Sequence, residues 1–112
     1  MKCRAACWLF LLASWPLAGL AQPAANTPAP NDKELLGMRL FNQSCRVCHT
    51  KPQPTSVQYG PTLSRTSAGS NDDAMRVFIS NGTAKMPGFR YHFKPAEIDA
   101  IVAYLKTIPS PD

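Results

Sequence analysis

Three stretches of the chain place apolar residues three or four positions apart, which is the spacing of one face of an α-helix. They cover residues 32–43, 71–80 and 95–108. The last is the most regular, with a stripe made of Ile98, Ile101, Val102, Leu105 and Ile108. No segment shows the convincing polar–apolar alternation of a half-buried strand. The pattern therefore predicts an all-α domain of three to four helices.

The residues at the ends of these stretches agree with helix boundaries. Asn31 followed by Glu34 has the spacing of a capping box. Pro95 suits the first position of a helix, and Asn81-Gly82 suits the end of one. The three stretches are thus expected to be separate helices with defined ends.

Residues 50–70 and 83–94 contain prolines and glycines and show no helical period, so we expect loops there. A structureless loop as long as residues 50–70 is uncommon in a small domain unless something organises it. A large cofactor would do so.

Gly37 lies inside the first predicted helix, where glycine costs about 1 kcal/mol relative to alanine. One interpretation is a tolerated surface position. The other is a close crossing with the last helix, where Ala100 and Ala103 are also small. The second interpretation is favoured, with Tyr104 packed against Phe41 beside the crossing.

The first residues form a segment of another kind. Lys2 and Arg4 precede an apolar run over residues 5–20, and small residues up to Ala21 suit cleavage by a signal peptidase. The run is shorter than the ~20 residues of a membrane-spanning helix. We expect residues 1–21 to be a secretory signal peptide; an uncleaved membrane anchor is the alternative.

Residues 22–31 are rich in proline and small residues, which predicts a flexible tether before a folded domain over residues 32–112. Removal of Lys2 and Arg4 reduces the twelve basic residues to ten, and the seven acidic residues then leave a charge of +3. This mildly basic charge does not indicate nucleic-acid binding.

The segment Cys45-Arg46-Val47-Cys48-His49 reads Cys-x-x-Cys-His, the signature of covalent c-type haem attachment. One helical turn would present both thiols to the haem vinyl groups, and His49 would follow as proximal iron ligand. A zinc site needs about four ligands, and no other cysteine remains after the signal peptide. A redox dithiol of the thioredoxin kind needs a βαβ context, which is not visible here.

Pro61 is a candidate partner for that histidine. A metal-bound histidine usually donates its second N–H to a carbonyl or carboxylate oxygen. The carbonyl oxygen of Pro61, within Gly60-Pro61-Thr62-Leu63, suits this role. An ordinary turn is the alternative.

Four pieces in this order resemble a class I c-type cytochrome, a small monohaem protein, over about residues 32–108. They are a helix with Gly37, Leu40 and Phe41, the Cys45–His49 motif, Gly60-Pro61-x-Leu63, and Met86-Pro87 before the last helix. The resemblance implies a cytochrome c fold around one covalently bound haem c. It places Cys45 and Cys48 on the vinyl groups, His49 and Met86 on the metal, and Pro61 behind His49. Tyr59 and Arg65 are candidates for the haem propionates.

The distal ligand has one rival. Met86 lies in a loop beside Pro87, whereas Met38 and Met75 lie in predicted helices. His92 in the same loop would also bind iron and would give a lower potential. Its other interpretation is a partly exposed loop histidine.

With His49 and Met86 on the iron, no coordination position stays open, so the resemblance implies a periplasmic electron carrier and not an enzyme. Its partners would be redox proteins (a dehydrogenase, reductase or oxidase) that dock transiently. Basic residues beside the ligands either steer an acidic partner or form an ordinary solvated surface: Arg46, Lys51, Lys85, Arg90 and Lys94. The alternatives are a dedicated subunit of a dehydrogenase or oxidase complex, and a haem peroxidase if Met86 dissociates.

Overall fold

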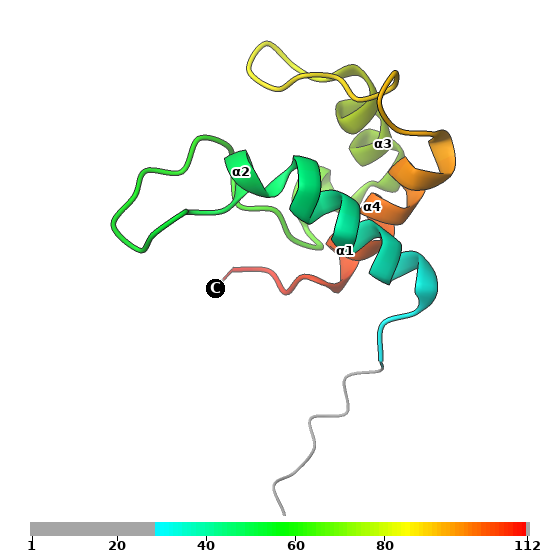
Figure 1. Ribbon diagram of the computed structural model, residues 1–112, viewed down its shortest axis with the longest axis horizontal. Helices are drawn as coiled ribbons and strands as arrows, with labels where there is room; N and C mark the ends of the chain where they lie inside the picture. Colours follow the sequence, from blue (N-terminus) through cyan, green and yellow to red (C-terminus); the bar gives the residue numbers. More distant parts are fainter. Residues whose placement is uncertain (1–28, 112) are drawn as a thin grey trace, which may run out of the picture.

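The computed structural model describes residues 29–111, so the predicted signal peptide and most of the tether lie outside it. The elements run α1 Asp32–Ser44, α2 Arg46–His49, η1 Ser67–Ser70, α3 Asp72–Asn81 and α4 Pro95–Thr107 (Figure 1). Over these residues there is no strand, and one isolated bridge joins Thr83 to Met86. The all-α prediction is confirmed. No helix between residues 29 and 111 has the length and apolar character needed to cross a membrane.

The predicted helix ends are present. The Asn31 side chain accepts a hydrogen bond from the Glu34 amide at 3.0 Å, and Glu34 Oε2 accepts one from the Asn31 amide at 2.9 Å. Asn71 caps α3 by accepting from the Ala74 amide at 3.0 Å, which is why this helix begins one residue later than predicted. Gly82 follows α3 with φ of 74°, a conformation that favours glycine.

Helices α1 and α4 cross at Gly37 (Figure 1). A Cβ atom at this position would overlap the carbonyl oxygen of Ala100 and lie 2.9 Å from Tyr104 Cβ. Phe41 and Tyr104 pack beside the crossing with ring centroids 5.4 Å apart. The predicted close crossing is confirmed, and glycine is required because two backbones meet there.

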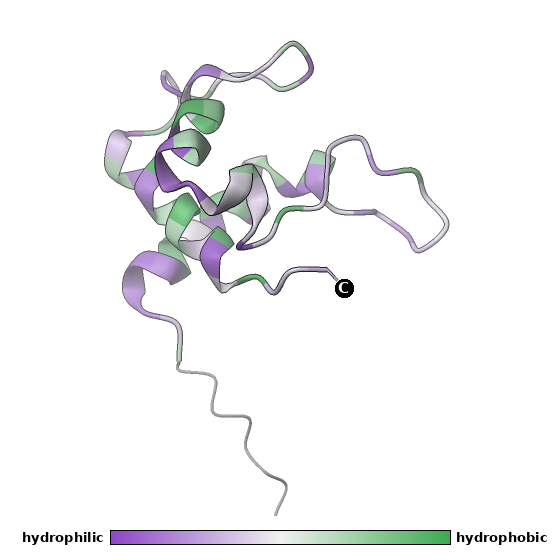
Figure 2. Cartoon of the chain, turned by 180° about the vertical axis from the view of Figure 1, so that it is seen from behind, coloured by the Kyte–Doolittle hydropathy of each residue, from purple (hydrophilic) through white to green (hydrophobic). Residues whose placement is uncertain are grey.

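Helix α4 lies at the centre of the core. The helices carry both hydrophobic and hydrophilic residues, as amphipathic helices do (Figure 2). The buried cluster joins α4 to α1, to α3 and to the loop before α4; its members are Phe41, Cys45, Met75, Ile79, Phe93, Ile98, Ile101, Val102 and Leu105. On α3, Met75 and Ile79 belong to this buried cluster, whereas Phe78 lies on the flank of the helix and is 47% exposed.

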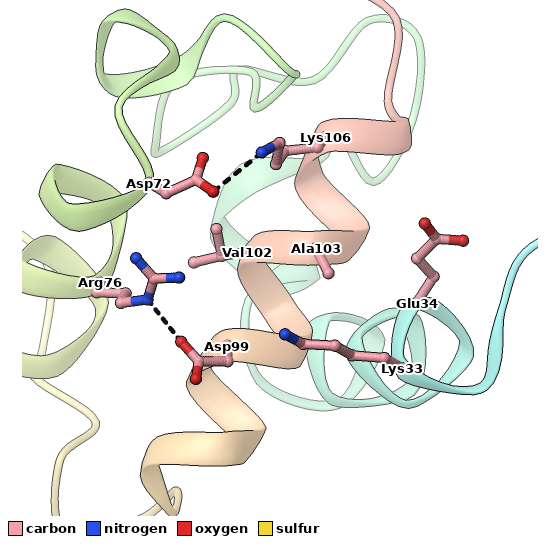
Figure 3. A pocket seen from close by; sticks show the side chains of 8 residues that line it. All are labelled: Lys33, Glu34, Asp72, Arg76, Asp99, Val102, Ala103 and Lys106. Atoms are coloured by element: carbon pink, nitrogen blue, oxygen red, sulfur yellow. Dashed lines mark hydrogen bonds and ion pairs between the residues drawn. The ribbon is translucent and has the colours of Figure 1, made fainter.

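A hollow lined by charged residues lies where α1, α3 and α4 meet (Figure 3). Arg76 on α3 donates to Asp99 on α4 at 2.5 Å, and Lys106 on α4 pairs with Asp72 at 2.9 Å. Lys33 lines the same hollow from α1. These contacts are partly exposed, so they favour one orientation of the helices more than they add stability.

The long loop divides into two parts. After α2 the first part extends away from the helices and returns to α2 at Gly60 (Figure 1). The second part is ordered by polar contacts: the Ser64 amide donates to Ser67 Oγ at 2.9 Å, and the Arg65 amide donates to the Ile108 carbonyl at 2.9 Å. It ends in the 3₁₀ turn η1, so the prediction of a structureless loop through residue 70 is wrong for its last part. Short-range serine and threonine bonds leave no periodic signal in a sequence.

Candidate functional site

The motif cysteines lie on one helical turn at the end of α1. Cys45 ends α1 and precedes α2, and its carbonyl oxygen accepts from the amides of Cys48 at 3.2 Å and His49 at 3.1 Å. Both thiols are free. Burial, followed by the neighbouring Cys48, raises the pKa of Cys45 to about 11. The free thiol of Cys45 is therefore protonated at neutral pH.

His49 is held by the loop that faces it. Its Nδ1 lies 2.8 Å from the carbonyl oxygen of Pro61. A carbonyl only accepts, so Nδ1 carries the proton and Nε2 keeps its lone pair. The hydrogen bond predicted from the sequence is present, and it leaves Nε2 as the nitrogen that can bind a metal.

Gly60 lets the loop approach the imidazole. A Cβ atom at residue 60 would lie 2.9 Å from both Cε1 and Nδ1 of His49. The Gly60 amide also donates to the Cys48 carbonyl at 2.8 Å. The backbone of the loop is therefore fixed against the motif itself, and a side chain at residue 60 would push the ring away.

Met86 lies in a tight turn after α3, and its side chain is half-buried. The Thr83 amide donates to the Met86 carbonyl at 2.8 Å, and the Met86 amide donates to the Thr83 carbonyl at 3.3 Å. The Phe89 amide then donates to the Ile79 carbonyl at 2.9 Å. The first two bonds close the turn on itself, and the third attaches its far side to the end of α3.

Two glycines make this attachment possible. A Cβ atom on Gly82 would lie 2.6 Å from the amide nitrogen of Gly88 and would overlap the Met86 carbonyl. A Cβ atom on Gly88 would lie 2.7 Å from the backbone of Asn81. The Met86 turn therefore requires residues without a side chain at both positions.

The other candidates lie at the surface. His92 is exposed, and its ring packs edge-on against Phe93 with centroids 4.6 Å apart. Tyr59 is 72% exposed, and Arg65 is exposed as well. The structure provides no contact that ties Tyr59 or Arg65 to a propionate, so their role stays a prediction.

Sequence reasoning missed Gln58. Its side-chain amide donates to the Gly60 carbonyl at 2.7 Å and to the Thr62 hydroxyl at 3.2 Å. A glutamine in a loop carries no pattern that would single it out. Only the folded loop shows that its amide spans the residue that faces His49.

The residues of this site fit a covalently held haem. They provide two free thiols on one turn, an imidazole nitrogen with its lone pair available, and a thioether on a separate loop. Large apolar side chains on the segments that carry these groups are strongly exposed: Val47 at 80%, Val57 at 94%, Tyr59 at 72% and Tyr91 at 95%. Such exposure is typical of surfaces that meet a ligand or a partner. The bound group supplies a one-electron iron couple.

A family model described as "Cytochrome C oxidase, cbb3-type, subunit III" matches residues 33–105. The comparison with curated proteins gave no significant match.

Solved structures of c-type cytochromes are similar to the chain. The c-type cytochrome SorU from Sinorhizobium meliloti is 28% identical, with a TM-score of 0.54 over 69% of this chain and 91% of SorU. The KustC0563 c-type cytochrome is 26% identical, with a TM-score of 0.52 over 62% of this chain and 93% of its own.

Cytochrome c6 from the diatom Phaeodactylum tricornutum shares the fold at 23% identity, with a TM-score of 0.50 over 64% of this chain and 88% of its own. The fold, the Cys45–His49 motif and the family match agree on one cofactor. The chain belongs to the cytochrome c family of that subunit III model, as a small class I c-type cytochrome that binds haem c covalently.

Proposed function

We propose that the protein is a periplasmic electron carrier whose haem iron is held between His49 and Met86. The observation that carries the proposal is the 2.8 Å hydrogen bond from His49 Nδ1 to the Pro61 carbonyl. It fixes the tautomer that leaves Nε2 free, and it makes the imidazole a stronger donor. A histidine prepared in this way is suited to bind iron permanently.

The Met86 turn supports the second ligand. The two hydrogen bonds between Thr83 and Met86 close this turn, and the bond from the Phe89 amide to the Ile79 carbonyl attaches it to α3. The thioether is therefore presented from a fixed segment. A methionine ligand raises the reduction potential relative to histidine. The exposed His92 in the same loop is the rival ligand.

Two permanent ligands favour electron transfer over catalysis. They leave no open coordination position for a substrate or a peroxide. Family members that carry electrons are generally not enzymes. A peroxidase activity would require Met86 to dissociate, and measurable turnover by the purified protein would contradict the proposal.

A far-red absorption band of the oxidised protein, typical of methionine on haem iron, tests the ligand set. Met86→Ala is expected to abolish this band, because no thioether remains at that position. His92→Ala serves as the matched control from the same loop and is expected to keep the band. If Met86→Ala keeps the band, or if His92→Ala alone loses the native spectrum, the assignment of Met86 is wrong.

The N-terminal residues support a location in the periplasm. Residues 1–21 have the composition of a signal peptide, and c-type haem is attached outside the bacterial cytoplasmic membrane, so we assign the protein to the periplasm.

Lys85, Arg90 and Lys94 are all exposed in the loop that carries Met86, and no acidic residue lies between residues 82 and 96. This surface suits transient docking of an acidic redox protein.

Electrostatic docking predicts a rate of electron transfer that falls as ionic strength rises, because salt screens charges separated by more than about 10 Å at 0.1 M. Reversing the charge with Lys85→Glu should flatten that dependence. Lys33→Glu, on α1 and away from this loop, is the control of equal charge. A rate that does not depend on salt would contradict steering.

A dedicated subunit of an oxidase or dehydrogenase complex is the second candidate. The description of the matching family model, which names a subunit of an oxidase, favours it. Purification from membranes under mild detergent distinguishes the two. A free carrier is released with the periplasmic fraction, whereas a subunit stays with its complex in fixed proportion.

A further inference from the structure

The side chain of Gln58 joins the residues on the two sides of Pro61. Its Nε2 donates to the Gly60 carbonyl at 2.7 Å and to the Thr62 hydroxyl at 3.2 Å. The Gly60 carbonyl has only lone pairs to offer, so the atom that contacts it is the amide NH₂ group. One half-buried side chain therefore spans the residue whose carbonyl faces His49.

The Pro61 carbonyl can change direction only by rotation about ψ of Pro61. The ring of Pro61 fixes φ near about −65°, so the direction of its carbonyl depends on ψ alone. Gln58 bonds to Gly60, which precedes Pro61, and to Thr62, which follows it. It therefore restrains the rotation about ψ of Pro61. The Gly60 amide, 2.8 Å from the Cys48 carbonyl, fixes the same turn to α2.

We infer that Gln58 is a positioning residue for the Pro61 carbonyl and, through it, for His49. The inference rests on the proposed ligation of iron by His49. A firm Nδ1–H···O bond raises the basicity of the imidazole, and a more basic ligand favours the ferric iron. Gln58 thereby keeps the reduction potential lower than the same ligands would give with a loose turn.

Loss of the Gln58 amide should have two measurable consequences. The Pro61 carbonyl gains freedom, so the proton on His49 Nδ1 should exchange with solvent about tenfold faster, in keeping with one weakened hydrogen bond. The iron equilibrium should shift about three- to tenfold toward the ferrous state, and tenfold corresponds to about 59 mV for one electron.

The test uses the holoprotein with two variants. Gln58→Ala removes the side chain, and Gln58→Leu keeps a neutral side chain of similar size without a donor. Gln53→Ala is the matched control, because Gln53 is an exposed glutamine of the same loop that contributes its backbone carbonyl to the Ser56 amide at 3.0 Å. A redox titration gives the potential, and ¹⁵N NMR of the reduced protein gives the exchange of the His49 Nδ1 proton.

Both Gln58 variants are expected to raise the potential and to speed the exchange, while Gln53→Ala matches the wild type. If the Gln58 variants match Gln53→Ala in both readouts, the inference is overturned. A lower melting temperature with an unchanged potential and exchange rate would overturn it too, because that result shows a purely structural role.

A failure of the proposed function is visible separately. In the reduced wild-type protein, a ligated His49 has ring protons shifted by the haem, whatever residue 58 is. If these shifted signals are absent from the wild type, the ligation by His49 is wrong. If they are present and the Gln58 variants change nothing, only the role of Gln58 is wrong.

Discussion

The α1–α4 crossing and the loop of residues 50–66 are fixed by different means. The crossing buries large apolar side chains and brings two backbones together at Gly37. The loop exposes Val57 and Tyr59 and is attached at its base by the Gly60 amide and the Gln58 side chain. The crossing is therefore held by apolar packing between helices, whereas the loop relies on a few polar contacts beside the motif.

The loop that carries Met86 lies between these extremes. Its Phe93 is buried in the core beside α4, its backbone also bonds to the end of α3, and Gly82 and Gly88 permit the close approach. Electron transfer requires that ligands move little when the iron changes charge. The α1–α4 crossing is the rigid part of the molecule, and a few specific hydrogen bonds fix the loops of Pro61 and Met86 to the helices.

The largest effect is expected from Gly37→Val. The new side chain would overlap the Ala100 carbonyl, so the helices must separate, at a cost of about 3 kcal/mol or more. Chemical denaturation of the holoprotein measures this loss. Gly69→Ala is the control: residue 69 has open space around it and φ of 64°, so only backbone strain of about 1–2 kcal/mol is expected. Equal losses in the two variants would mean that the crossing is not tight.

A smaller effect is expected from Gly88→Ala. Its Cβ atom would meet the Asn81 backbone at 2.7 Å and displace the Met86 turn, at a cost of about 1–3 kcal/mol. The far-red band of the oxidised protein should weaken or vanish as the thioether moves. Ala84→Ser, at an exposed position of the same loop, should leave the band intact. A full band in Gly88→Ala would show that the turn adjusts independently of α3.

The ion pair between α3 and α4 should give a weak pH dependence. The hydrogen bond from Arg76 lowers the pKa of Asp99, so the folded protein binds this proton less tightly than the unfolded chain. The stabilisation is therefore present above about pH 4, the ordinary range of an aspartate, and is lost as the pH falls through the lowered pKa. Between neutral and acidic pH, the melting temperature of Asp99→Asn should fall less steeply than that of the wild type. Parallel curves would show that the pair adds nothing.

The smallest effect is expected at the tip of the long loop. Val57 is 94% exposed, so Val57→Ser should change stability by less than about 0.5 kcal/mol. Denaturation of the holoprotein provides the measurement. A loss above about 1 kcal/mol would show that the tip folds back onto the haem once the cofactor is attached, and the contrast with the crossing would then be weaker.

Local chemistry made much of this protein predictable. Capping pairs, prolines and the apolar stripe of the last helix placed α1, α3 and α4 to within a residue or two. The glycine in α1 predicted the crossing because an interior glycine is costly unless a backbone lies against it. Prediction was wrong where contacts are irregular, as in the polar turn from Ser64 to Ser70 that ends the long loop.

The helices, the covalent attachment motif and the identity of the cofactor could be read from the sequence, because these depend on residues close together in the chain. How the loops beside the motif are held became visible only in the folded chain. The Gln58 amide bonds to Gly60 and Thr62, and the Phe89 amide joins the Met86 turn to Ile79 of α3. Such bonds follow no period along the chain, so they are visible only when the backbone brings their atoms within reach.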